Sequence, residues 1–160
     1  MHFQAEHTFD GPPGVVAAVL TDPDFYRDLD LPDLSRPDVL QSGSDGGLPV
    51  LRLRYEFVGT LDPVALHLLG GNRLAWIQEV QVQRSGDSGE LTFAAAIDPN
   101  RLRGSARFTL EDAGGRCIRR LSGDLTVAVP LIGPRAEKRI VPGILRRLDI
   151  EAEAINRSLV

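Results

Sequence analysis

Three polar residues fall on strand faces that are otherwise apolar, and they are the first candidates for chemistry. His7, Tyr55 and Gln78 each alternate with apolar neighbours at the two-residue spacing of a β-strand. A histidine or tyrosine in such a position can act as a general acid or base when a substrate lies within hydrogen-bond reach. All three can instead orient a bound ligand, or be buried polar residues satisfied by the protein itself. The sequence leaves these alternatives open.

Signals for a metal site or a nucleophile are weak. The three histidines are far apart in the sequence, and His2 and His7 fall on opposite faces of one strand, which argues against a local metal site. Cys117 is the only cysteine and has no evident base beside it, so we interpret it as a small hydrophobic residue. We therefore expect no metal and no cofactor, and we favour a protein that is not an enzyme.

Alternating apolar and polar residues predict a sheet that would position the three candidates. A first strand covers residues 2–10, and two short helices follow it, since Pro13 and Pro23 suit the first position of a helix. Turn residues then separate a further series of predicted strands. These strands are residues 36–43, 48–58, 72–84, 90–97, 101–111 and 116–129.

The segment Gly133–Val160 has the pattern of an amphipathic helix, which must bury its apolar stripe against the sheet. The stripe changes direction near Pro142, which cannot donate a hydrogen bond to the carbonyl of Lys138. We therefore expect two helical pieces. The second would lie on the sheet, while the first, with Gly133-Pro134, would border the entrance of a pocket.

A curved sheet around one helix tends to enclose a cavity, and the inward faces of the strands supply residues to line it. Small residues there either let the sheet bend or leave volume for a ligand. Aromatic residues can form apolar walls, although core packing is the more common role for them. The candidate cavity residues are His7, Tyr55, Phe57, Trp76, Gln78, Phe93, Ala95, Gly104, Ala106, Phe108, Gly123, Ile140 and Ile144.

The connector at residues 59–71 is unusually apolar for a surface loop. It contains Leu66, Leu68 and Leu69 and ends in two glycines. One interpretation is a buried helical turn. The other is an entrance flap over the mouth of the cavity, because mobile apolar loops often act as lids.

The bulk composition narrows the classes of partner. With 160 residues, the chain is expected to form a single domain over residues 1–160. A net charge of −4 argues against a nucleic-acid-binding protein. No apolar run is long enough to span a bilayer, and the first residues lack the pattern of a signal peptide, so we expect a cytoplasmic protein. The oligomeric state stays open.

The predicted order of elements is that of the α+β helix-grip fold. Together with Glu6-His7-Thr8-Phe9-Asp10, Pro12-Pro13 and the segment Val127–Gly133, it makes the chain resemble a bacterial branch of the START-like superfamily, also called SRPBCC. That superfamily includes polyketide cyclase/dehydrase-like and birch-pollen-allergen-like proteins. The resemblance implies a seven-stranded curved antiparallel sheet around the C-terminal helix, an apolar cavity between them, and the 59–71 connector near its entrance.

Members of the superfamily bind lipids, sterols, polyketides or plant metabolites, and some are cyclases. Their catalytic residues differ between branches, so the resemblance assigns no catalytic residue here. Our leading hypothesis is a protein that binds or carries a small hydrophobic molecule, lipid-like or polyketide-like. The alternative is a cyclase or dehydratase that uses His7 or Tyr55 as acid or base. A protein-interaction module ranks third, because the alternation predicts no broad exposed apolar patch.

Overall fold

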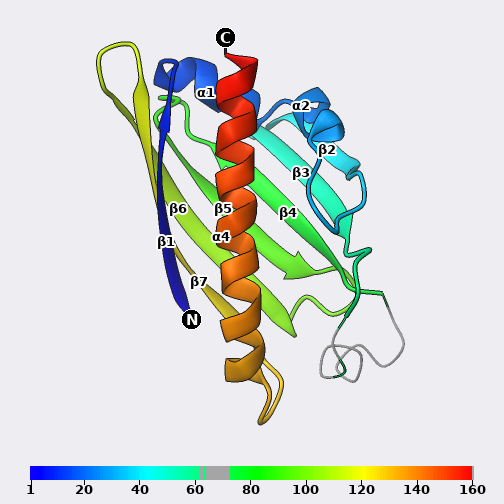
Figure 1. The fold of residues 1–160 in the computed structure, drawn as a ribbon. Helices are drawn as coiled ribbons and strands as arrows, with labels where there is room; N and C mark the ends of the chain where they lie inside the picture. Colours follow the sequence, from blue (N-terminus) through cyan, green and yellow to red (C-terminus); the bar gives the residue numbers. More distant parts are fainter. Residues whose placement is uncertain (62, 64–72, 160) are drawn as a thin grey trace.

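The computed structural model describes residues 1–61, 63 and 73–159 of the chain. Within them, seven antiparallel strands form one curved sheet in the order β1-β7-β6-β5-β4-β3-β2, and a long helix, α4, lies across one face (Figure 1). This confirms the predicted helix-grip fold. The elements are β1 (His2–Phe9), α1 (Pro13–Leu20), α2 (Pro23–Asp28), β2 (Asp38–Asp45), β3 (Leu48–Glu56), β4 (Ala75–Val82), β5 (Ser88–Ala95), β6 (Leu102–Asp112), β7 (Cys117–Val127) and α4 (Gly133–Ser158).

Strand β1 joins the sheet beside β7, so the first and last strands of the chain are neighbours. The expected alternation is present in β1, where Phe3 and Phe9 are buried and Gln4 and Thr8 are exposed. In this register His7 lies opposite Arg119 of β7. The pairing therefore places two polar side chains together on the inward face.

The two short helices begin at the prolines, as the sequence predicts. Pro13 and Pro23 occupy first-turn positions of α1 and α2, and the Asp22 carboxylate caps α2 by accepting a hydrogen bond from the backbone N–H of Asp24 at 2.9 Å. Helix α2 buries Tyr26, which packs with Leu51, Leu53 and Tyr55 of β3. This cluster packs α2 against β3.

Two inward glycines allow close approach between neighbouring parts of the sheet. A Cβ at Gly123 would lie 2.2 Å from the carbonyl oxygen of Ser105, and one at Gly89 would lie 2.4 Å from the Phe108 ring. Both distances are far inside van der Waals contact, so a larger side chain would push the strands apart. The space at Gly123 is filled by neighbouring atoms of the sheet.

Helix α4 continues without a break from Gly133 to Ser158, and the predicted division into two pieces is wrong. Pro142 removes one hydrogen-bond donor, as expected, but both Pro142 and Lys138 are on the exposed side of the helix. Water can therefore satisfy the Lys138 carbonyl that Pro142 leaves without a partner. The apolar contacts on the opposite side keep the two halves in one helix.

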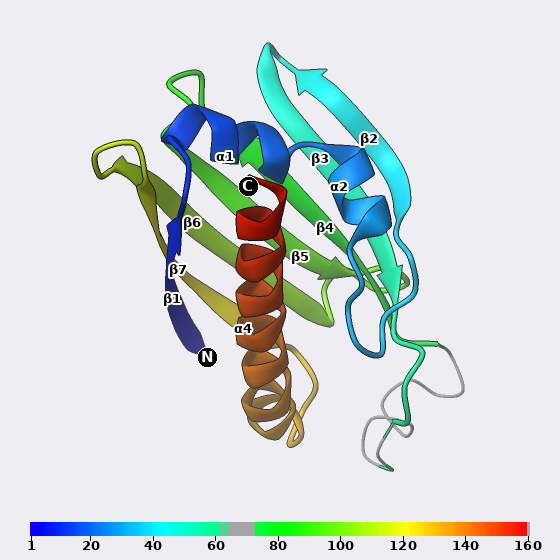
Figure 2. The same ribbon diagram turned by 45° about the horizontal axis from the view of Figure 1, so that its top comes forward.

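Helix α4 packs mainly on β1 and β7, at one side of the sheet (Figure 2). Its buried residues Val141, Leu148 and Ile155 belong to the larger core cluster, which includes residues of β1, α1 and β4–β7. The strands β3 and β4 lie further from the helix, beside α2. No helix among the described residues has the length and apolar character needed to cross a membrane.

Candidate functional site

A cavity of about 420 Å³ lies between α4 and the part of the sheet that the helix does not cover closely. Its wall comes from the loop after α2, the segment that follows β3, the starts of β4 and β6, the end of β5, a residue of β7 and one face of α4. The described lining residues are Leu31, Pro32, Asp33, Leu34, Phe57, Thr60, Leu61, Leu74, Ala75, Trp76, Phe93, Ala95, Leu102, Leu125, Arg139, Ile140, Gly143, Ile144, Arg146, Arg147 and Ile150.

Aromatic side chains from neighbouring strands form the sheet side of this cavity. Trp76 of β4 and Phe93 of β5 both line it, and Trp76 stacks on Tyr55 of β3 with ring centroids 5.9 Å apart. Strand register brings them together, because Tyr55 is opposite Trp76, and Trp76 is opposite Ala95. A small alanine beside a large indole leaves space that a ligand can occupy.

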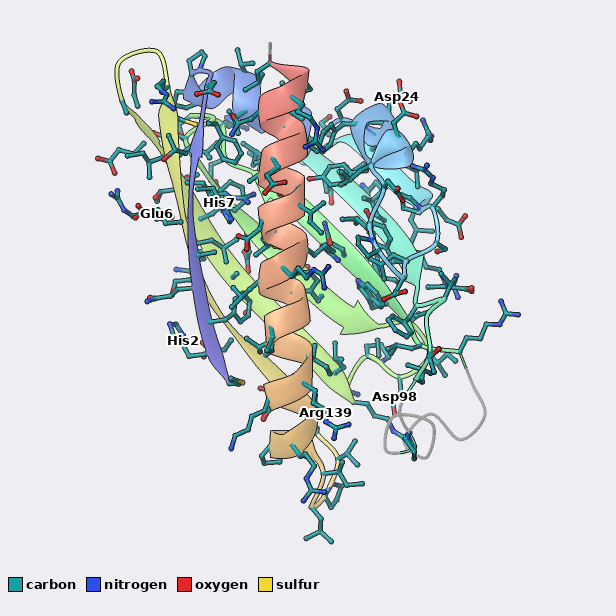
Figure 3. The ribbon with its side chains drawn as sticks, in the orientation of Figure 1. His2, Glu6, His7, Asp24, Asp98 and Arg139 are labelled. Atoms are coloured by element: carbon teal, nitrogen blue, oxygen red, sulfur yellow. The ribbon has the colours of Figure 1, made fainter. Side chains whose placement is uncertain are left out.

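The helix side of the cavity combines apolar and cationic residues. Ile140, Ile144 and Arg147 line it at spacings of four and three, which places all three on one face of α4. The guanidinium of Arg147 lies 5.3 Å from the ring centroid of Tyr55 and 5.5 Å from that of Phe93. These distances are typical of cation–π contacts. Arg139 also lines the cavity, from the first half of α4 (Figure 3).

Beside the cavity, five polar side chains form a hydrogen-bonded network that we call the Arg119 cluster: Tyr26, Glu151, Arg119, His7 and Asp149. Arg119 donates to Glu151 Oε1 at 2.7 Å, and Tyr26 donates to Glu151 Oε2 at 3.1 Å. The side chains of Arg119 and Glu151 are only 3% and 5% exposed. The cluster links α2, β1, β7 and α4 through one buried ion pair.

The contacts of His7 determine its tautomer. Its Nδ1 lies 3.0 Å from Nη2 of Arg119, and its Nε2 lies 2.8 Å from Asp149 Oδ1. An arginine has only donors, so Nδ1 must accept and the ring proton must be on Nε2, donated to Asp149. His7 lies between β1 and α4 (Figure 3), and both ring nitrogens are already engaged by protein groups.

Burial keeps both tyrosines protonated. It raises the pKa of Tyr55 to about 12, with the Arg147 charge opposing the rise and the Glu151 charge adding to it. Burial also raises the pKa of Tyr26 well above 10, and the Glu151 carboxylate increases the effect. At neutral pH both phenols are therefore hydrogen-bond donors and neither can act as a base.

The structure divides the sequence-predicted cavity residues into two groups. Phe57, Trp76, Phe93, Ala95, Ile140 and Ile144 line the cavity. The remaining residues, His7, Tyr55, Gln78, Gly104, Ala106, Phe108 and Gly123, are absent from its described lining. The predicted entrance flap residues Leu66, Leu68 and Leu69 lie outside the described residues.

Each residue away from the lining has a local reason for its position. Gly104, Ala106 and Gly123 are packed against neighbouring strands or side chains, and Phe108 is part of the larger core cluster. Tyr55 is covered by Trp76 and Arg147, and Gln78 is 1% exposed between Leu53 and Phe93. Among the described residues, Gln78 Oε1 has no hydrogen-bond partner.

Among the site residues that were missed in the sequence, Arg119, Arg147 and Glu151 had a signal in the pattern. Arg119 has the inward phase of β7, between Cys117 and Leu121, so it was a charged residue on a buried face. Arg147 is three residues after Ile144, and Glu151 is three after Leu148, both within the apolar stripe of α4. A charged residue at an inward position predicts a buried partner of opposite charge, and Arg119 and Glu151 are such partners.

The candidate site contains no evident metal centre in the part of the chain that the structure describes. No group of three or more histidine, cysteine, aspartate or glutamate side chains is close enough there to hold an ion. The chemistry that these residues offer is therefore apolar contact in the cavity, the cation of Arg147, and the hydrogen bonds of the Arg119 cluster.

A family model described as "Protein of unknown function (DUF2505)" matches residues 4–159. No curated protein matches the chain significantly. Among solved structures, the chain is similar to protein TTHA0849 of Thermus thermophilus, with a TM-score of 0.66 and 13% identity over 98% of this chain and 95% of that one.

Two further structures carry more informative descriptions. The Zhui aromatase/cyclase of Streptomyces sp. R1128 has a TM-score of 0.64 and 16% identity over 99% of this chain and 92% of that one. A START superfamily protein of Mycobacterium smegmatis has a TM-score of 0.59 and 15% identity over 98% and 95%. These likenesses confirm the START-like fold that the sequence resemblance implied.

Proposed function

The chain belongs to the DUF2505 family, and we propose that it binds or carries a small hydrophobic molecule in the cavity between α4 and the sheet. The observation that supports this most strongly is the cavity itself. Its volume of about 420 Å³ falls within the ~300–1,000 Å³ typical of small-molecule sites. Its described wall is mainly aliphatic and aromatic, and its charged residues are Asp33 and three arginines of α4.

The fold of the similar structures supports the same proposal. A START superfamily protein and an aromatase/cyclase share this arrangement of sheet and helix. At 13–16% identity the likeness concerns the fold, so lipid-like and polyketide-like ligands both remain within the proposal. The cavity is what such ligands would occupy.

The positions of the acid–base candidates favour binding over catalysis. His7 is not part of the described cavity wall, and both its nitrogens are engaged by Arg119 and Asp149. Tyr55 is covered by Trp76 and Arg147 and stays protonated up to high pH. A general base must reach the proton that it removes, and neither residue is placed to do so. Cyclase or dehydratase chemistry is thus the weaker proposal.

Gly143 provides a direct test of the cavity. It lines the cavity, and a Cβ added there would meet no atom within 4 Å. A side chain at this position therefore begins in open space, and we expect the indole of Gly143→Trp to occupy part of the cavity, while Gly143→Ala adds only one methyl group. Both replace a glycine in a helix interior, which should stabilise the helix by about 0.5–1 kcal/mol for alanine.

The measurement is the fluorescence of Nile red, a neutral apolar dye, with decan-1-ol as the competitor. We expect the wild type and Gly143→Ala to bind the dye and release it to decanol, and Gly143→Trp to bind neither while keeping its melting temperature. Equal binding by all three proteins would place the dye elsewhere and contradict the proposal. No binding by the wild type would contradict it as well.

A further inference from the structure

The charged groups of the cavity wall are mostly cationic, although the chain as a whole carries a net charge of −4. Among the described lining residues, the ionisable side chains are Arg139, Arg146 and Arg147 on α4 and Asp33 on the loop after α2. Arg139, Arg146 and Asp33 are exposed, whereas Arg147 is half-buried. The cation that a bound molecule would meet inside the cavity is therefore Arg147.

The guanidinium of Arg147 lies against two aromatic rings and has no anionic partner among the described residues. It lies over the faces of Tyr55 and Phe93, and it forms no hydrogen bond or ion pair with the described residues. Contacts with ring faces orient the planar group, but within the described part of the chain its N–H donors have no acceptors. A half-buried guanidinium in this state is available to an oxygen ligand.

The carboxylates that α4 could offer to Arg147 are engaged elsewhere. Glu151, one turn further along the helix, accepts from Arg119 with one oxygen and from Tyr26 with the other. Asp149 accepts from His7. The carboxylates of Glu151 and Asp149 are thus bound within the Arg119 cluster, and neither serves as the counterion of Arg147.

We propose that the molecule bound in the cavity is a hydrophobic carboxylate, with its carboxylate paired to the Arg147 guanidinium and its apolar body against Ile140, Ile144 and Trp76. This inference rests on the proposed function and adds the charge of the ligand to it. Arginine and a carboxylate match in planar geometry and can form two parallel hydrogen bonds. The cation–π contacts with Tyr55 and Phe93 hold the guanidinium before the ligand arrives, which lowers the entropic cost of pairing.

The test compares two probes that differ only in the head group, decanoate and decan-1-ol, at neutral pH, where a carboxylic acid is ionised. Displacement of Nile red gives the Kd of each. We expect the wild type to bind decanoate about 10–100-fold more tightly than decanol, the range given by a hydrogen bond to a charged group. The preference should weaken in high salt.

Two variants at position 147 and one control locate the effect. Arg147→Met keeps the apolar stem and removes the charge. Its Kd values for the two probes should therefore agree within about threefold, a smaller difference than the tenfold that corresponds to 1.4 kcal/mol. Arg147→Lys keeps the charge without the planar fork and should retain part of the preference. Arg107→Met removes an exposed arginine from the outer side of β6 and should behave as the wild type.

The outcomes separate this inference from the proposed function. Equal affinity of the wild type for decanoate and decanol would overturn the carboxylate proposal and leave hydrophobic binding intact. A preference for decanoate that survives in Arg147→Met would overturn the role of Arg147. A failure of the dye and both probes to bind the wild type would overturn the proposed function itself. If Arg147→Met does not fold, Arg147→Lys and the salt dependence decide the question.

Discussion

Removing the arginine of the Arg119 cluster should destabilise the protein severely. Arg119 donates to Glu151 at 2.7 Å and to His7 at 3.0 Å, and its guanidinium lies 5.2 Å from the Phe9 ring centroid. In Arg119→Met the apolar stem remains, but Glu151 Oε1 and His7 Nδ1 lose their donor. The result is a buried carboxylate with Tyr26 as its one remaining partner in the cluster.

The magnitude follows from how deeply the pair is buried. Both side chains are at most 5% exposed, so water cannot replace the lost guanidinium without rearrangement. Breaking such a pair costs about 3–5 kcal/mol. For a chain of this length, each kcal/mol lowers the melting temperature by about 2–4 °C, so we expect a fall of roughly 6–20 °C.

Urea denaturation followed by circular dichroism gives the free energy of unfolding. The matched control is Arg120→Met, because Arg120 is the next residue of β7, faces outward, and pairs with the exposed Glu6 and Glu111. Surface pairs of this kind contribute about 0–1 kcal/mol, so the control should lose little stability.

A double-mutant cycle with Glu151→Gln separates the free energy of the Arg119–Glu151 interaction from the effect of lost packing contacts. The variant Arg119→Met/Glu151→Gln removes both charges and keeps an acceptor for Tyr26. Its loss in free energy of unfolding should be smaller than the sum of the losses of the two single variants, by about 1 kcal/mol or more. The reasoning is refuted if Arg119→Met costs less than about 1 kcal/mol, or if the two substitutions are additive.

Two further predictions concern the tyrosines and the proline of α4. The folded protein should show no tyrosine ionisation near pH 10 in an absorbance titration, because burial raises the pKa of Tyr55 to about 12 and that of Tyr26 well above 10. Since the unfolded chain releases these protons near pH 10, stability should fall between about pH 10 and 12; a phenol titrating near 10 in the folded state would contradict this. Pro142→Ala restores a donor to the Lys138 carbonyl and should stabilise the protein by up to about 3 kcal/mol, less the unfolded-state entropy that proline removes. An unchanged or lower urea midpoint would show that the exposed proline costs the helix nothing.

The sequence predicted the fold well because strand alternation and the apolar stripe of the last segment are local patterns. Phe3 and Phe9 of β1, Leu51 and Leu53 of β3, and Phe93 of β5 are buried as their spacing predicts. The resemblance of short segments to START-like proteins supplied the topology. Position along a strand thus determines which way a side chain points.

What the sequence could not supply was the partner of each inward residue. Gly123 is inward as predicted, but only the register with β6 shows that Ser105 and Ala106 occupy the space beside it. His7 is inward too, yet its contacts with Arg119 and Asp149 depend on where α4 lies. Likewise, the sequence did not show that the carbonyl of Lys138 faces water, which is why α4 can continue through Pro142 without a break.

The position of α4 over β1 and β7 places the Arg119 cluster, on which folding depends, away from the more exposed residues of the cavity wall. Ala95, Gly143 and Ile144 are not fully buried, whereas Arg119 and Glu151 are. Substitutions at these three wall positions should therefore have small effects on stability, and those in the Arg119 cluster large ones. Related chains can accumulate changes around the cavity while the framework stays constant. Ligand preference can then diverge between such proteins without any change of architecture.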